Sequence, residues 1–115
     1  MASEQRIARL REEIKRDAGD IIHKMKDPRL GFVTVTDVEV TRDLRYATIY
    51  VSIYGEPDTV RRSLAALTSG TGHVRSELGK RLKLRHTPEL AFKVDESAQR
   101  GAAIDALIAK LHEND

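Results

Sequence analysis

The residues best suited to chemistry in this chain are basic side chains that follow two closely spaced glycines. Residues 71–93 hold six basic and two acidic residues, whereas the whole chain has a formal charge of only +2. A local excess of positive charge is typical of a protein that contacts a phosphate backbone. The candidate contact residues at the glycines and in this segment are Gly70, Gly72, Arg75, Lys80, Arg81, Lys83 and Arg85.

Helical spacing indicates which of these side chains are available. Val74, Leu78 and Leu82 recur every fourth residue and are predicted to face inward, so Arg75, Lys80 and Lys83 should project outward. Backbone N–H groups at a helix start after the glycines would add donors for phosphate. The alternative is a solvated helix face, which runs of charge usually form. We favour phosphate contact.

Two other basic groups lie near the N-terminus. Lys24, Lys26 and Arg29 flank Pro28 and rank second as candidate contacts. The first helix adds a further group, in which acidic residues alternate with the basic ones. That group could contact RNA or could form a salt-bridged exposed face, and the sequence leaves both readings open. Its members are Arg6, Arg9, Arg11, Lys15 and Arg16.

Three tyrosines, Tyr46, Tyr50 and Tyr54, fall on one side of a predicted strand. Aromatic rings on a sheet can stack on bases. Tyrosine is also a common strand residue whose ring covers a half-exposed sheet. We favour the covering role.

Other chemistry is not indicated by the sequence. The chain has no cysteine, and its four histidines, His23, His73, His86 and His112, are dispersed. We therefore predict no catalytic residues, no metal site and no cofactor. No apolar run approaches membrane length and no signal-peptide core is present, so we expect a cytoplasmic protein with no membrane partner.

The elements that must position these residues can be predicted along the chain. An apolar stripe predicts a first helix from Ser3 to about Met25, ended by Pro28. Two strands follow, over 31–41 and around 46–54. Apolar residues change face at Thr36-Asp37, which predicts a β-bulge there. The turn between the strands is predicted at 41–43.

The second half of the chain is predicted to alternate helix and strand. A helix opens at Glu56-Pro57, a break spans 68–72, and a shorter helix follows. A third strand is expected over 89–95 and a last helix carries Ile104, Leu107, Ile108 and Leu111. The order α-β-β-α-(Gly break)-α-β-α predicts one α+β domain over residues 1–115. It should have a three-stranded sheet with helices on one face.

This order is similar to the bacterial (type II) K-homology, or KH, fold, whose GxxG loop clamps single-stranded RNA. The chain has Gly70-Thr71-Gly72 at that point, a GxG. The hairpin DPRLGFVTVTDVEVTRDLRYATIYVS and the later SGTGHVRSELGKRLKLRHTPELAFKVDES resemble the ribosome-binding factor A family over nearly the whole chain. That family typically has Ala-x-Gly at the break. Gly70 stands at the alanine position and should loosen the kink.

The resemblance implies a non-enzymatic factor for late maturation of the small (30S) ribosomal subunit. It implies binding to free immature subunits and to 16S rRNA, a role in rRNA processing and a link to growth in the cold. Assembly GTPases are candidate partners, and we expect a monomer. The alternative is a KH-scaffold module for protein interaction or translational regulation, since one scaffold can serve many functions.

Overall fold

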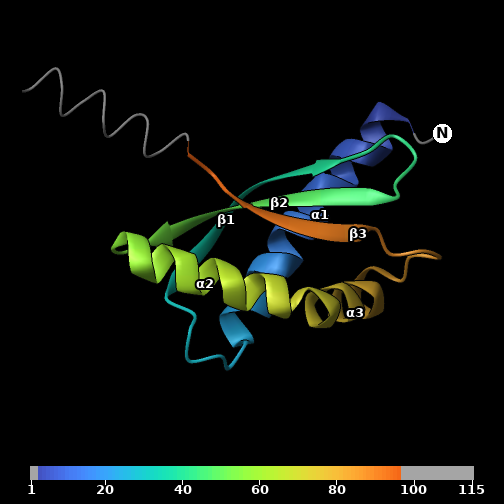
Figure 1. The fold of residues 1–115 in the computed structure, drawn as a ribbon. Coiled ribbons are helices and arrows are strands. Elements are labelled where there is room, and N and C mark those ends of the chain that lie inside the picture. The colour runs from blue at the N-terminus through green and yellow to red at the C-terminus, as the bar shows by residue number, and fades with distance from the viewer. Residues whose placement is uncertain (1–2, 97–115) are drawn as a thin grey trace, which may run out of the picture.

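A computed structural model describes residues 3–96 of the chain. Three helices and three strands follow one another in the predicted order (Figure 1). They are α1 (Glu4–Lys24), β1 (Phe32–Val40), β2 (Tyr46–Tyr54), α2 (Pro57–Ser69), α3 (Thr71–Leu82) and β3 (Glu89–Val94). The predicted last helix lies outside the described residues. The α+β class is confirmed.

Helix α1 forms where its apolar stripe predicts it. The Ser3 hydroxyl caps the helix by accepting a hydrogen bond from the Arg6 N–H at 3.2 Å. The apolar stripe, which includes Leu10, Ile14 and Ile21, is buried in the core. The helix ends at Lys24, three residues before Asp27-Pro28. Burial of this stripe against the sheet and α3 therefore holds α1 in place.

The sheet is mixed, with β2 in the middle. Strand β1 pairs antiparallel with β2, and β3 pairs parallel with β2. The register shifts between Val35 and Asp37, which confirms the predicted bulge at Thr36. The Thr36 hydroxyl donates to the Asp95 carboxylate at 2.7 Å, and Arg11 Nε donates to the Val38 carbonyl at 2.7 Å. Arg11 therefore braces the bulge from α1.

The two faces of β2 differ as predicted. Ala47, Ile49, Val51 and Ile53 are buried under the helices. The tyrosines lie on the other face but are not equivalent, since Tyr54 is 83% exposed, Tyr46 is 53% exposed and Tyr50 is half-buried. Burial, together with the charge of Glu39, raises the pKa of Tyr50. The covering role fits Tyr50 better than the other two.

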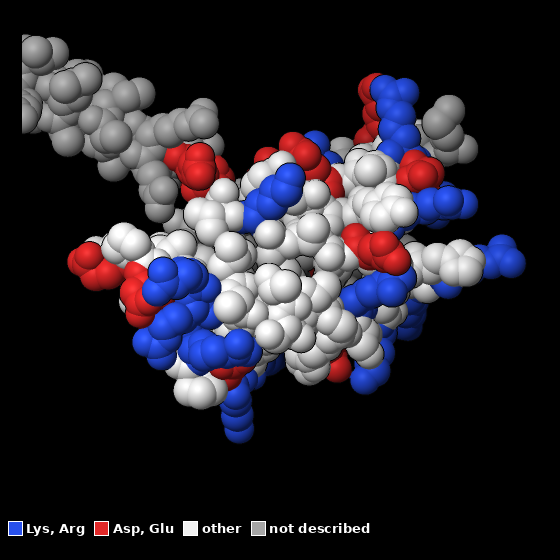
Figure 2. Space-filling view, viewed as in Figure 1, with Lys and Arg blue, Asp and Glu red and all other residues white. Residues whose placement is uncertain are grey.

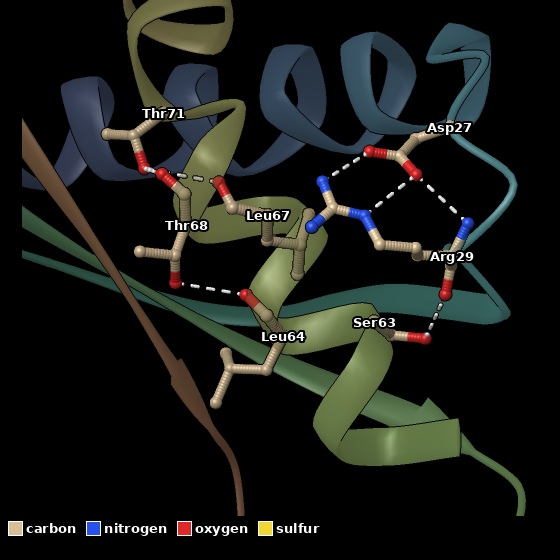
Figure 3. Close-up of polar contacts among 7 residues, drawn as sticks. All are labelled: Asp27, Arg29, Ser63, Leu64, Leu67, Thr68 and Thr71. Carbon is tan, nitrogen blue, oxygen red and sulfur yellow. Dashed lines mark hydrogen bonds and ion pairs between the residues drawn. The ribbon is translucent and has the colours of Figure 1, made fainter. Parts of the chain in front are cut away.

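The break between α2 and α3 is a single residue, which is shorter than the predicted span of 68–72. Helix α2 ends at Ser69, α3 starts at Thr71, and Gly70 lies between them at φ −88° and ψ 6°. The Thr71 hydroxyl donates to the Leu67 and Thr68 carbonyls at 3.1 and 2.8 Å (Figure 3). These bonds satisfy carbonyls at the end of α2, so the two helices can follow almost directly (Figure 1).

We expect Gly70→Ala to stabilise the protein by up to about 1 kcal/mol, because alanine can adopt this backbone conformation. Alanine also lowers the conformational entropy of the unfolded chain, so less entropy is lost on folding. A Cβ here would lie 2.6 Å from Met25 Cε, the end of a flexible side chain that can turn aside, and 3.3 Å from the Ala66 carbonyl oxygen, which must shift slightly. Urea unfolding measures the change. Gly72→Ala is the matched control, because a Cβ there meets nothing within 4 Å. A loss above about 1 kcal/mol at Gly70 alone would show that Met25 and the Ala66 carbonyl cannot make room for the added Cβ.

Candidate nucleic-acid interface

Positive side chains gather at the two ends of the face seen in Figure 2, and the middle of that face is mostly uncharged. One end carries the start of α2. The other carries the β1–β2 turn and the loop between α3 and β3. Most predicted contact residues belong to α3 and this loop, so the fold concentrates them at one end of the molecule. The individual side chains differ in how far they are already engaged.

The Arg75 side chain is hydrogen-bonded to the loop that follows α3. Its Nε donates to the Pro88 carbonyl at 3.1 Å, and one terminal nitrogen donates to the Thr87 carbonyl at 2.9 Å. Its side chain therefore fixes the path of residues 87–88 into β3. The sequence predicted an outward projection without this contact. Arg75 can still present its remaining donors to a ligand, but replacing it would also disturb the loop.

Arg81 joins α3 to α1. Its guanidinium lies 2.7 Å from the Asp20 carboxylate and 3.9 Å from that of Asp17. Lys24 reaches the same Asp20 carboxylate at 3.1 Å. Hydrogen bonds from Arg81 first, and then from Lys24, hold the pKa of Asp20 below its ordinary value. Two predicted RNA contacts, Arg81 and Lys24, thus also carry an ion-pair network between the helices.

Because the pKa of Asp20 is lowered in the folded protein, its ion pairs stabilise the fold fully above about pH 4. The contribution is lost as the pH falls through that lowered pKa. We expect Asp20→Asn to lower the melting temperature at pH 7 and to reduce the further loss between about pH 4 and pH 2. Asp27 and Asp43 also have lowered pKa values and remain in the variant, so acid sensitivity should fall without disappearing. Identical pH profiles would contradict this role.

Among the predicted contact residues, the most available cations are Lys26, Lys83 and Arg85. All three are exposed, and none has an ion pair to any residue between 3 and 96. Lys80 pairs only with Glu77, at 3.4 Å on the surface. Surface pairs of this kind contribute little and exchange readily for a phosphate. Lys83 also ends α3 in the left-handed conformation, at φ 51° and ψ 37°, where glycine is the usual residue.

Arg29 is held inside the loop between α1 and β1. The Asp27 carboxylate accepts from Arg29 Nε at 3.1 Å and from a terminal nitrogen at 2.8 Å (Figure 3). This bidentate contact lowers the pKa of Asp27 and raises that of Arg29. Ser63 secures the loop from α2 by accepting from the Gly31 N–H at 2.9 Å and donating to the Arg29 carbonyl at 3.3 Å.

The glycines of the predicted site have different surroundings. Gly70 packs against the end of α1, whereas Gly72 is exposed with open space where a Cβ would lie. The N-cap of α3 is Gly70, which offers no side chain to cap the first turn of that helix. The tertiary structure adds Arg6, Arg45 and His86 to this end of the molecule. They come from α1, from the β1–β2 turn and from the loop after α3, and their spacing in the sequence does not show that these segments meet.

Residues 3–96 form a small α+β domain with a basic end built from α3, its following loop and the β1–β2 turn. A sequence model of the family described as Ribosome-binding factor A matches residues 6–108. The chain is 49% identical over 112 residues to Ribosome-binding factor A of Clostridium botulinum (strain Okra / Type B1), covering 96% of this chain and 93% of that protein. The chain belongs to the ribosome-binding factor A family.

Solved structures agree with this assignment. A solution NMR structure of a Thermotoga maritima protein described as a putative ribosome binding factor A matches with a TM-score of 0.73 and 34% identity, over 84% of this chain and 93% of that one. A Thermus thermophilus ribosome binding factor A model, fitted into a cryo-EM map of a 30S complex, matches with a TM-score of 0.66 and 28% identity. That match covers 78% of this chain and 96% of the other.

Proposed function

We propose that this protein binds the small (30S) ribosomal subunit and assists its late maturation by contacting 16S rRNA. Membership of the ribosome-binding factor A family over residues 6–108 carries this proposal. The Thermus thermophilus relative, which was fitted into a map of a 30S complex, supports the same partner. The exposed cations at one end of the domain supply the chemistry, because lysine and arginine side chains replace counterions on phosphates.

The protein acts by binding, without catalysis. A factor that binds one rRNA arrangement more tightly than another shifts the population by the ratio of its two affinities. Among residues 3–96 no group of three histidine, aspartate or glutamate side chains could hold a metal ion. In the same part of the chain no helix could cross a membrane. We further propose that the protein assists rRNA processing and supports growth in the cold.

Co-sedimentation with purified immature and mature small subunits tests this function. We expect the protein to pellet with immature subunits and to be released as salt rises, because each phosphate contact adds to the salt dependence. No pelleting at low salt would contradict the proposal. Pelleting with no dependence on salt would instead favour the alternative of a protein-interaction module.

A further inference from the structure

The sheet is covered by helices on one face only. On the other face lie the alternate residues of β2 from Tyr46 to Tyr54, and none of them is buried. Their register partners on β1 and β3 are all exposed. We call this surface, formed by the alternate β2 residues and these partners, the open face. Because no helix among residues 3–96 covers it, a second molecule can reach it.

Large aromatic side chains are exposed on the open face. Among residues 3–96, the large hydrophobic residues that remain exposed are Phe32, Tyr46 and Tyr54, at 66%, 53% and 83%. The two tyrosines lie on β2, and Phe32 is the register partner of Tyr54. The Phe32 ring also meets that of His23 edge to face, with 6.3 Å between the ring centres. Exposed apolar side chains that gather on one surface mark an interaction site, whereas scattered ones do not.

The open face also carries negative charge. Glu39 and Glu89 are exposed on it, and neither has an ion pair to any residue in the described part of the chain. Burial first, and then the charges of Glu39, Asp37 and Asp95, raise the pKa of Tyr50. Carboxylates therefore surround the hydroxyl of the central tyrosine.

The other charges on this face are partly balanced or of opposite sign. Asp37 lies 3.4 Å from Arg11, which extends from α1 to the edge strand β1. The Asp95 carboxylate accepts the hydrogen bond from the Thr36 hydroxyl. Lys93 is the only cation on the open face among residues 3–96. Glu39 and Glu89 thus remain as the carboxylates best placed to bind cations of a partner.

These two carboxylates flank the exposed ring of Tyr46. Glu89 is the register partner of Tyr46, and Glu39 lies opposite Thr48, the next open-face residue of β2. A guanidinium group can bind a carboxylate through two parallel N–H donors while its plane stacks on an aromatic ring. An RNA strand, by contrast, would bring its phosphates against these carboxylates. The open face therefore fits arginine side chains and disfavours RNA.

Two other occupants fit this charge less well. A second copy of the chain would place the same carboxylates against one another, which costs free energy. Residues 97–115 hold two basic and three acidic residues, so their net charge does not complement the open face. A basic segment of a different protein is the occupant that matches both the charge and the exposed rings.

We propose that the open face docks an arginine-rich segment of a protein of the small subunit, through Glu39, Glu89 and Tyr46, while the cations of α3 and its following loop contact rRNA. The inference rests on the proposed function and adds a protein partner and its chemistry. It assigns opposite charges of the domain to two classes of partner.

A first test measures binding of a fluorescent peptide of alternating arginine and glycine by anisotropy. Glu39→Gln with Glu89→Gln should weaken binding about tenfold, for two lost charge-assisted contacts. Tyr46→Thr should weaken it about threefold, for one lost stacking contact. The same peptide with lysine in place of arginine should bind about threefold more weakly, because an ammonium group lacks the planar pair of donors.

The matched control is Glu12→Gln with Glu56→Gln, which removes the same charge at two exposed positions outside the open face. It should bind the arginine peptide within about twofold of the wild type. No binding of the peptide, an equal loss in this control, or equal binding of the lysine peptide would overturn the proposal.

A second test places a diazirine-bearing amino acid at Ala91, an exposed open-face residue of β3, and irradiates the protein on immature small subunits. The expected product is a crosslink to a subunit protein. It should keep its size after RNase treatment, and mass spectrometry should find an arginine-rich peptide. The same group at Gly72 is the control, and its product should shrink with RNase because it joins rRNA.

Four results at Ala91 would overturn the docking site: a crosslink to rRNA, to a second copy, to residues 97–115, or to nothing while the protein still pellets with subunits. In each of these cases, pelleting leaves the proposed function standing. Failure to pellet contradicts that function separately, and the peptide measurement then decides alone whether the open face binds arginine.

Discussion

Replacing Lys26, Lys80 and Lys83 together by glutamine is expected to weaken binding to the immature small subunit by about a hundredfold at physiological salt. These lysines are exposed, and only Lys80 has an ion pair within the described chain, to Glu77. Each would release a counterion from a phosphate, so the slope of affinity against salt should fall by about two to three. Sedimentation at several salt concentrations measures both quantities.

The fold should survive this change, because none of the three side chains is in the core. The control variant replaces Arg16, Arg62 and Lys93 by glutamine, three exposed residues away from α3 and its loop. It should bind within about threefold of the wild type, as expected when long-range charge is screened. Equal losses in the two variants would mean that net charge, and not this surface, determines binding. Arg75 is left unchanged because it braces residues 87–88.

Ser63→Ala is expected to destabilise the protein by about 2 kcal/mol, through two lost hydrogen bonds at a fully buried side chain. The Ser63 hydroxyl is the contact from α2 that holds Arg29 and Gly31 in the loop before β1 (Figure 3). Urea unfolding measures the stability. Hydrogen exchange should also show faster exchange at the Gly31 amide, because its acceptor has been removed.

Ser69→Ala provides the control for this experiment, since Ser69 is an exposed residue at the end of the same helix. It should change stability by no more than about 0.5 kcal/mol. If Ser63→Ala had an equally small effect, water would be satisfying the Gly31 and Arg29 groups without Ser63. If stability fell while Gly31 exchange stayed unchanged, the serine would matter for packing and not for the loop.

Much of the fold could be predicted because short-range sequence patterns determine where most of its helices and strands form. The stripe of α1, the alternation of β2 and the phase change at Thr36 each depend on neighbours within a few residues. The break at Gly70 was placed correctly but predicted too long, because the sequence does not show that the Thr71 hydroxyl would close α2. The parallel pairing of β3 with β2 also depends on contacts between distant segments.

The candidate interface was predictable only in part. Charge density identified the segment from Gly70 to Arg85, but it could not separate Arg75 and Arg81, which bind within the protein, from Lys83 and Arg85, which face solvent. Those contacts reach residues more than ten positions away in the chain. The same limit hid the meeting of Arg6, Arg45 and Arg85 at one cavity, since they come from the start of α1, the β1–β2 turn and the loop after α3.

The sequence by itself determined the family, the order of elements and the concentration of positive charge, because these depend on residue type and short spacing. Only the tertiary structure decided which cations are free, which tyrosine is half-buried and how three separate segments meet at the basic end. The physical reason is that a guanidinium or a ring acquires its role from partners brought together by burial of the core. Sequence spacing does not encode those partners directly.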